Sequence, residues 1–256
     1  MDMKFVDEGR GRVILIVHGG MGDSSAWARV ARPLARRYRV IRLHRRRYRL
    51  DLAGAGAVTI AEEVEDVLAL AGLVGEPVLL VGHSSGGVIA LEAAAAAPAL
   101  FAGLVVYEPP VVLGDPLGGR ALCAARAAVA AGKPGKAIAI FERDILEVGV
   151  VARTVFRMVV AALPQLRAYV PRQLDDVAAI DSLGSRLSSY AAIELPTVLL
   201  SGDRSPAHLG KRVDALRAVM PKARKIVMAG QAHNANDFAP HRLARLIEDF
   251  AAEAFS

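Results

Sequence analysis

Cysteine, aromatic residues and long apolar runs are all scarce in this chain of 256 residues, and each shortage excludes something. Cys123 is the single cysteine, so no intrachain disulfide can form, which is typical of a protein from a reducing compartment. Charges or glycines interrupt the longest apolar stretches, so we expect no membrane-spanning helix and no membrane partner. No apolar run precedes Val13, so no secretory signal is visible and we predict a cytoplasmic location.

Positive charge is in excess, with a net charge of +6 and a cluster of arginines at Arg42, Arg45, Arg46, Arg47 and Arg49. Nucleic acid is one partner for such a cluster. However, aromatic residues make up only 5% of the chain and no nucleic-acid-binding motif is present. We therefore expect no nucleic-acid partner and favour a solvated basic loop, with binding of an anionic substrate group as the alternative.

Short apolar runs alternate with helical patterns along much of the chain, which predicts a mostly parallel, doubly wound α/β sheet. An edge strand is expected near residues 4–6, and buried strands over 13–17, 38–43, 78–81, 103–107, 197–201 and 223–228. Helices are expected over 25–37, 60–72 with Thr59 as its cap, 88–97, 207–219 and 240–254. The 54% of hydrophobic residues is enough for a sizeable core.

The pattern changes between residues 111 and 193, where strand-like runs disappear. Ala-rich helical segments replace them near 119–131, 135–148, 151–163 and 165–187. We interpret residues 111–193 as a helical lid inserted into a core formed by residues 1–110 and 194–256. Ligands of open α/β sheets bind at the carboxyl ends of the strands, so the lid is expected to cover that edge.

One motif combines a strand, a serine and a helix in the order that nucleophilic catalysis requires. Gly82-His83-Ser84-Ser85-Gly86 fits G-x-S-x-G and stands between an apolar run and an Ala-rich segment. The turn of such a nucleophile elbow is too tight for side chains two residues either side of the serine, and glycine removes them. Ser84 is therefore the predicted nucleophile, at the positive end of a helix. The alternative is a glycine-rich turn with a surface serine.

A serine hydroxyl is a weak nucleophile and needs a base within hydrogen-bond reach. In the chain order serine, acid, histidine, the base follows the last strand, where His233 stands. The other histidines are interpreted as surface or core residues: His18, His44, His83, His208 and His241.

His18-Gly19-Gly20, the serine motif, the helical insertion and Gly230-Gln231-Ala232-His233 together resemble the α/β-hydrolase fold superfamily, as small bacterial serine hydrolases with a helical lid. The resemblance extends over essentially the whole chain. It implies that the N–H groups of Gly20 and Ser85 form an oxyanion hole. It also implies a carboxylate that orients His233.

The identity of this carboxylate is open, because the sequence departs from the usual pattern. The superfamily commonly places the acid three residues after the glycine that ends the strand near 197–201, and that position is Ser205 here. Asp203 is the nearest carboxylate, and Glu108, at the end of the strand near 103–107, is the other candidate. Some members carry their acid there, so we favour Glu108.

The sequence thus predicts a serine esterase that cleaves a carboxylic ester or thioester of a small, largely apolar substrate through an acyl-enzyme. We expect no cofactor and no metal, and a monomer or homodimer. Met21, Trp27, Phe141 and Phe156 are the predicted substrate-binding residues, and Leu146 and Met158 are further candidates for the apolar pocket. The alternatives are a non-catalytic small-molecule-binding protein of the same fold, or a cofactor-free perhydrolase or C–C bond hydrolase with the same triad.

Overall fold

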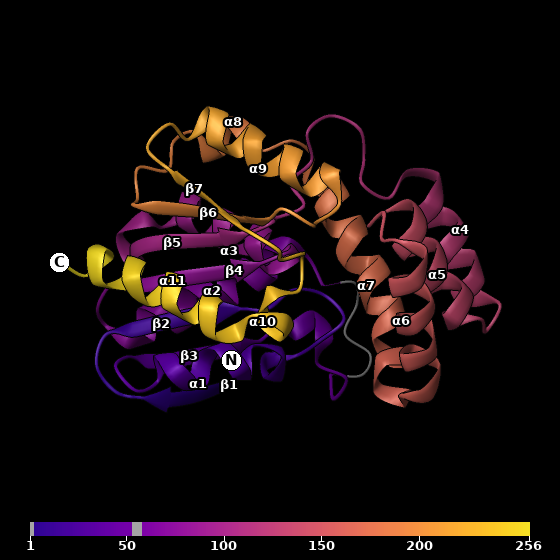
Figure 1. Ribbon diagram of the computed structural model, residues 1–256, viewed down its shortest axis with the longest axis horizontal. Coiled ribbons are helices and arrows are strands. Elements are labelled where there is room, and N and C mark those ends of the chain that lie inside the picture. Colours follow the sequence, from indigo (N-terminus) through magenta and orange to yellow (C-terminus); the bar gives the residue numbers. More distant parts are fainter. Residues whose placement is uncertain (1–2, 53–57) are drawn as a thin grey trace.

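The computed structural model describes residues 3–52 and 58–256. Its seven-stranded sheet has the order β1-β3-β2-β4-β5-β6-β7, and only β1 runs antiparallel to its neighbour (Figure 1). The strands are β1 (Lys4–Gly9), β2 (Val13–Val17), β3 (Arg39–His44), β4 (Val78–His83), β5 (Phe101–Tyr107), β6 (Thr197–Gly202) and β7 (Arg224–Met228). The predicted mostly parallel sheet with its edge strand near the N-terminus is therefore confirmed.

Helices cover both faces of the sheet, as short apolar strands buried on both sides require. One face packs against α1 (Ala28–Leu34), α10 (Ala235–Phe238) and α11 (Pro240–Ala254). The other packs against α2 (Ile60–Val74), α3 (Ser85–Ala96) and α9 (Ala207–Val219). Short 3₁₀ turns occupy η1 (Ser24–Trp27), η2 (Arg46–Tyr48) and η3 (Pro98–Leu100). No helix of the described residues has the length and apolarity needed to cross a bilayer.

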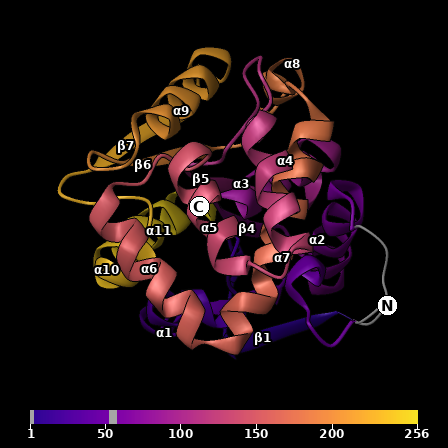
Figure 2. The same cartoon turned by 90° about the vertical axis from the view of Figure 1, so that its right-hand side faces the viewer.

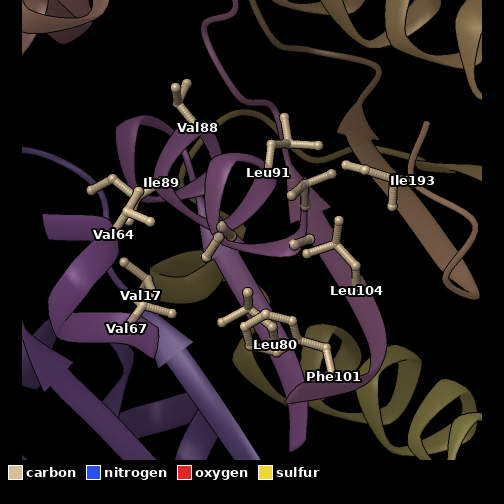
Figure 3. Close-up of a cluster of buried hydrophobic side chains, with 14 of the residues drawn as sticks. Val17, Val64, Val67, Leu80, Val88, Ile89, Leu91, Phe101, Leu104 and Ile193 are labelled. Carbon is tan, nitrogen blue, oxygen red and sulfur yellow. The ribbon is translucent and has the colours of Figure 1, made fainter. Parts of the chain in front are cut away.

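The larger of the two core clusters lies between the sheet and α2 and α3. Figure 3 shows Val64 and Val67 of α2 and Ile89 of α3 facing Leu80 and Leu104 of the central strands. Burying a side chain of this size contributes about 1.5–3 kcal/mol relative to leaving it in water. Helix α3 is buried from Ser85 to Leu91, because its small residues let it lie close against the strands. The N-terminus of α3 is thereby fixed at the carboxyl end of the central strand β4.

The strand order places a topological switch point between β2 and β4. The chain leaves β2 to form β3 on one side and returns to form β4 on the other. Connections that diverge in this way leave a crevice at the carboxyl ends of the two strands, where ligands of open α/β sheets bind. The loops that follow β2 and β4 carry the His18-Gly19-Gly20 and Ser84 segments, so the switch point brings these two motifs together.

Residues 111–193 contain α4 (Gly119–Ala130), α5 (Pro134–Asp144), α6 (Val150–Ala162), α7 (Pro164–Leu183) and α8 (Leu187–Tyr190). Helices α4 to α7 form a layer beyond the end of the sheet, whereas α8 lies beside α9 (Figures 1 and 2). Helices α4 to α7 enclose a hydrophobic cluster of their own. The last predicted segment is two helices, because Gly184, with φ of 67°, ends α7. The longest helix, α7, also reaches α2 and α3 of the core.

Candidate active site

Ser84 lies in a sharp turn between β4 and α3, with φ of 52° and ψ of −128°. Such angles are strained for a residue other than glycine, and strain of this kind gathers at functional sites. A Cβ atom on Gly82 would lie 2.6 Å from the Cβ of Ala90, and one on Gly86 would lie 2.3 Å from the carbonyl oxygen of His18. The turn therefore requires glycine at both positions, for the steric reason that the sequence indicates.

His233 lies on the loop after β7, and its ring is held by Glu108. The distance between His233 Nδ1 and Glu108 Oε2 is 2.7 Å. Glu108 follows β5, is fully buried, and accepts a second hydrogen bond from the backbone N–H of Gly202 at 2.7 Å. An ionised carboxylate only accepts, so Nδ1 of His233 carries the proton and Nε2 is left as an acceptor. Of the two carboxylates left open by the sequence, Glu108 is the one in contact with His233.

Asp203 has a different environment. Its Oδ1 accepts a hydrogen bond of 2.7 Å from the backbone N–H of Gly230, and its side chain is exposed. This contact closes the turn between the loops that follow β6 and β7. The structure therefore assigns Asp203 a local structural contact and does not bring it to the histidine.

Two further side chains hold the His233 loop, and neither contact is predictable from the sequence pattern. His83 donates from Nε2 to the carbonyl oxygen of His233 at 2.9 Å, and its ring centroid lies 4.8 Å from that of His233. The hydroxyl of Tyr107 donates to the carbonyl oxygen of Ala232. Burial, and then the neighbouring His233, holds the pKa of His83 well below its usual value. His83 is thus a neutral donor that fixes the loop.

The loop after β2 packs directly against the Ser84 turn. A Cβ atom on Gly19 would lie 3.0 Å from the Cβ of Ser84, and one on Gly20 would lie 1.9 Å from Oε1 of Gln173. His18 accepts at Nε2 from the backbone N–H of Arg45 at 3.1 Å, so its Nδ1 carries the proton and donates to the carbonyl of Gly19 at 2.6 Å. Burial, and then Arg45, lowers the pKa of His18 to about 3, so this ring is also neutral.

A small cavity of about 50 Å³ lies beside Ser84, between the sheet and the insertion. Its walls come from the Ser84 turn, the loop after β5, helices α5, α7 and α9 and the segments at their ends. The lining residues are Ser84, Ser85, Pro110, Leu117, Phe141, Ile145, Leu146, Gln173, Val177, Ile180, His208 and Leu209. Most of them are apolar, and the polar side chains apart from the two serines are Gln173 and His208.

Only part of the predicted pocket lining is found in this cavity. Phe141 and Leu146 line it, whereas Trp27 is 1% exposed and packs into the core beneath the sheet. Met21 and Phe156 pack against the hydrophobic cluster of the insertion and do not line the cavity. Met158 faces outward from α6 and is 61% exposed. The sequence pattern assigns these residues to helices or loops, but it does not say which side chains face Ser84.

Gln173 and His208 are cavity residues that sequence reasoning missed. His208 is the second residue of α9, its Nε2 lies 3.0 Å from the carbonyl oxygen of Leu146, and burial lowers its pKa. Gln173 has its Oε1 3.0 Å from the hydroxyl of Tyr48. A polar residue within a predicted helix carries no signal that it faces a cavity, so neither position could be found from the pattern alone.

The arginine cluster is not a solvated basic loop, and that expectation is wrong. Arg45 and Arg47 are each only 1% exposed. Arg45 Nη2 lies 2.9 Å from Glu63 Oε2 and 2.8 Å from Asp176 Oδ1, and Arg47 contacts the same two carboxylates. The guanidinium of Arg46 pairs with Asp66, and that of Arg49 with Asp51. Buried charges require such partners, and one of them, Asp176, lies 131 positions after Arg45.

Within the described residues, histidine, cysteine, aspartate and glutamate side chains form no cluster of three or more that could hold a metal ion. The side chains found here are instead the Ser84 hydroxyl, the imidazole of His233 against the ring of His83 next to Ser84, and the carboxylate of Glu108 on His233 Nδ1. These residue types are the parts needed for nucleophilic catalysis with a general base.

A sequence profile of the Alpha/beta hydrolase family matches residues 14–246, and the chain belongs to this family. An alpha/beta hydrolase from Sphaerobacter thermophilus shares 25% identity and a TM-score of 0.81, over 99% of this chain and 96% of that one. A thermophilic esterase from Thermogutta terrifontis shares 20% identity and a TM-score of 0.79, over 99% and 94%. Est816, an N-acyl homoserine lactone degrading enzyme, shares 21% identity and a TM-score of 0.76, over 97% and 96%. Among curated proteins, no sequence matches the chain significantly.

Proposed function

We propose that the protein is a serine hydrolase that cleaves a carboxylic ester or thioester through an acyl-enzyme. The observation that carries the proposal is the 2.7 Å contact between His233 Nδ1 and Glu108 Oε2, on a loop fixed to His83 beside the strained turn of Ser84. This pairing fixes the tautomer of His233, so its Nε2 is available to take a proton. A serine becomes an effective nucleophile when such a base is in reach.

In the proposed reaction, Ser84 Oγ attacks the substrate carbonyl while His233 Nε2 takes the hydroxyl proton. Glu108 stays ionised and stabilises the imidazolium that forms. The tetrahedral intermediate collapses as His233 returns the proton to the leaving alcohol or thiol, which leaves Ser84 acylated. Water then repeats the sequence: His233 takes its proton, the oxygen adds to the acyl carbon, and Ser84 leaves with the proton.

We assign the backbone N–H groups of Ser85 and Gly20 as the donors for the oxyanion. Ser85 is the first residue of α3, where the helix dipole favours negative charge. Gly20 follows Gly19, which is packed against Ser84, and side chains are excluded at Gly20 by Gln173. Removing one donor from such a pair typically costs about 2.7–4 kcal/mol of transition-state stabilisation.

The substrate proposed is small and largely apolar. Phe141, Leu146 and Val177 are among the cavity walls, and the cavity is small, with a volume of about 50 Å³. Residues 111–193 supply most of these walls, which supports their role as a lid. A lactone is a cyclic ester, so the lactone-degrading activity named for Est816 places lactones in the substrate panel.

The test is covalent labelling of the native protein with a fluorophosphonate probe. We expect stoichiometric labelling of the wild type and none of Ser84→Ala, because only an activated serine attacks phosphorus at a useful rate. Hydrolysis of p-nitrophenyl esters of increasing acyl length should be fastest for acetate and butyrate. A folded wild-type protein that is not labelled would contradict the proposal and favour a non-catalytic binding protein.

A further inference from the structure

Helix α7 of the insertion reaches the two backbone segments to which the oxyanion donors are assigned. Gln173 and Asp176 lie three residues apart on α7, so both side chains leave the same face of the helix. Asp176 is fully buried and Gln173 is 7% exposed. Asp176 is linked to the Ser85 segment through Arg45, and Gln173 borders the Gly20 segment.

Asp176 holds Ser85 together with Arg45. Arg45 Nη1 donates to Ser85 Oγ at 2.7 Å and to Asp176 Oδ2 at 3.1 Å, so one guanidinium nitrogen bridges the two side chains. Asp176 fixes the guanidinium of Arg45, and Arg45 in turn restricts the rotamer of Ser85. Because Ser85 is the first residue of α3, fixing this side chain also fixes the direction of its backbone N–H.

Gln173 holds the Gly20 segment together with Tyr48. The Tyr48 hydroxyl lies 2.9 Å from Asp176 Oδ2 and 3.0 Å from Gln173 Oε1. Both groups also border Gly20, where a Cβ atom would be 1.9 Å from Gln173 Oε1 and 2.8 Å from the Tyr48 oxygen. The loop after β2 is therefore packed between the Ser84 turn and the amide of Gln173, and Gly20 has little room to move.

The charges of this cluster make its geometry rigid. Arg45 and Arg47 face Glu63 and Asp176, two charges of each sign, and all four side chains are at most 2% exposed. Burial alone would raise the pKa of Asp176, but Arg45 and Arg47 outweigh it, so the pKa is lowered and the carboxylate stays ionised. Moving Asp176 away would leave buried positive charge without its partner, which is strongly unfavourable.

We propose that Asp176 and Gln173 are positioning residues for the oxyanion hole, and that α7 is a fixed part of the catalytic centre. This inference rests on the proposed function, since it concerns the same two N–H groups. The insertion then does more than cover the cavity: through Asp176 it orients Ser85, and through Gln173 it confines Gly20. Neither side chain needs to touch the reacting atoms for this effect.

The sharpest test is Ser85→Ala, which removes the hydroxyl link but keeps the backbone N–H and every charge of the cluster. We expect kcat for p-nitrophenyl acetate to fall about tenfold, less than the roughly 10²–10³-fold loss on removing a donor, because the N–H is misdirected but present. KM should change less than about twofold, because ground-state binding does not use the oxyanion contact. Inhibition by phenylboronic acid, which forms a tetrahedral anion on Ser84, should weaken about as much as kcat.

Asp176→Asn should show the same division between kcat and KM, with a larger loss. Asp175→Asn is its matched control, because Asp175 is adjacent on α7 but pairs with Arg126 on the surface; its kinetics should equal those of the wild type.

If Asp176→Asn does not fold, Ser85→Ala decides alone. Wild-type kcat and boronate affinity in Ser85→Ala would overturn the inference. A wild-type protein that the fluorophosphonate probe does not label would instead overturn the proposed function, so the two failures are distinguishable.

Discussion

Glu108 supplies the carboxylate that contacts His233, although the superfamily pattern commonly places the acid at position 205. Ser205 occupies the usual place of the acid, but its Oγ is buried and has no hydrogen-bond partner among the described residues. Glu108 reaches the same region from the neighbouring strand, with one oxygen on the N–H of Gly202 and the other on His233. Its φ of 45° is strained for glutamate, and the two hydrogen bonds offset this strain.

Glu108→Gln should lower kcat by about 10³–10⁴-fold, because an amide N–H facing Nδ1 would favour the wrong tautomer of His233. Asp203→Asn is the matched change and should alter kcat less than about threefold, since Asp203 contacts only the Gly230 N–H. Steady-state hydrolysis of p-nitrophenyl acetate by the two variants, each checked for its melting temperature, measures the difference. Equal losses in both, or none in Glu108→Gln, would show that His233 is oriented by another group.

At the scale of residues, steric requirements were predictable and side-chain directions were not. Gly82 and Gly86 could be interpreted from the motif, although the atoms that exclude a side chain belong to Ala90 for Gly82 and to His18 for Gly86. The burial of Arg45 could not be predicted, because its partner Asp176 lies 131 positions later. In the sequence, where the acidic partners are not adjacent, the run of arginines has the pattern of a solvated loop, although the folded chain buries Arg45 and Arg47.

Helix α2 illustrates what local sequence determines at the scale of elements. The Thr59 side chain accepts from the N–H of Glu62, and the Glu62 side chain accepts from the N–H of Thr59, which is a complete capping box. One turn into the helix, Glu63 reaches the buried arginines. The cap therefore fixes where α2 begins, and α2 presents the carboxylate of Glu63 to Arg45 and Arg47.

Thr59→Ala should reduce the free energy of unfolding by about 1 kcal/mol, the usual effect of losing such a cap. We expect kcat to be unchanged, because Glu63 is buried and ion-paired with Arg45 whether or not the cap is present. Urea denaturation gives the first quantity and ester hydrolysis the second. Thr59→Ser, which keeps the capping oxygen, is the control and should lose at most a few tenths of a kcal/mol. A fall in kcat with Thr59→Ala alone would mean that the start of α2 is coupled to the site.

Elements with strong periodicity were predictable, and their packing was not. Helices α9 and α11 have the bounds that the sequence predicts, because apolar spacing and proline define them. The helices of the insertion were also predicted, but the contact of α7 with Ser85 was not. That contact depends on how the insertion folds back onto the core, which no local pattern of α7 encodes.

Buried ionisable groups give the whole molecule a pH-dependent stability. His18, with its pKa lowered to about 3 by burial and Arg45, and His83, lowered by burial and His233, stay neutral in the folded chain. In the unfolded chain each takes up a proton near pH 6.5, so the stability they contribute is present above pH 6.5 and is lost as the pH falls. His44 and His208, whose pKa values burial also lowers, act in the same direction.

Glu142 opposes this trend. Burial raises its pKa to about 7, so the folded chain takes up a proton there as the pH falls below 7, while the unfolded chain does so only near 4.5. Two protons taken up by His18 and His83 of the unfolded chain, against one by Glu142 of the folded chain, leave a net difference of one, to which His44 and His208 add in the same direction. Between pH 6 and pH 5 the free energy of unfolding should therefore fall by at least about 1.4 kcal/mol per pH unit.

Glu142→Gln tests this balance, because it removes the opposing proton and leaves both histidines in place. The decline between pH 6 and pH 5 should steepen by about 1.4 kcal/mol per pH unit, since the one opposing proton is removed. Urea denaturation of both proteins at pH 7, 6 and 5 measures the slopes. At pH 7 the variant should be no less stable than the wild type, because Glu142 Oε2 is buried without a hydrogen-bond partner in the described chain. Equal slopes of stability against pH in the two proteins would mean that Glu142 is ionised in the folded protein at pH 6. A wild-type stability that rises toward pH 5 would mean that the buried histidines accept protons without unfolding.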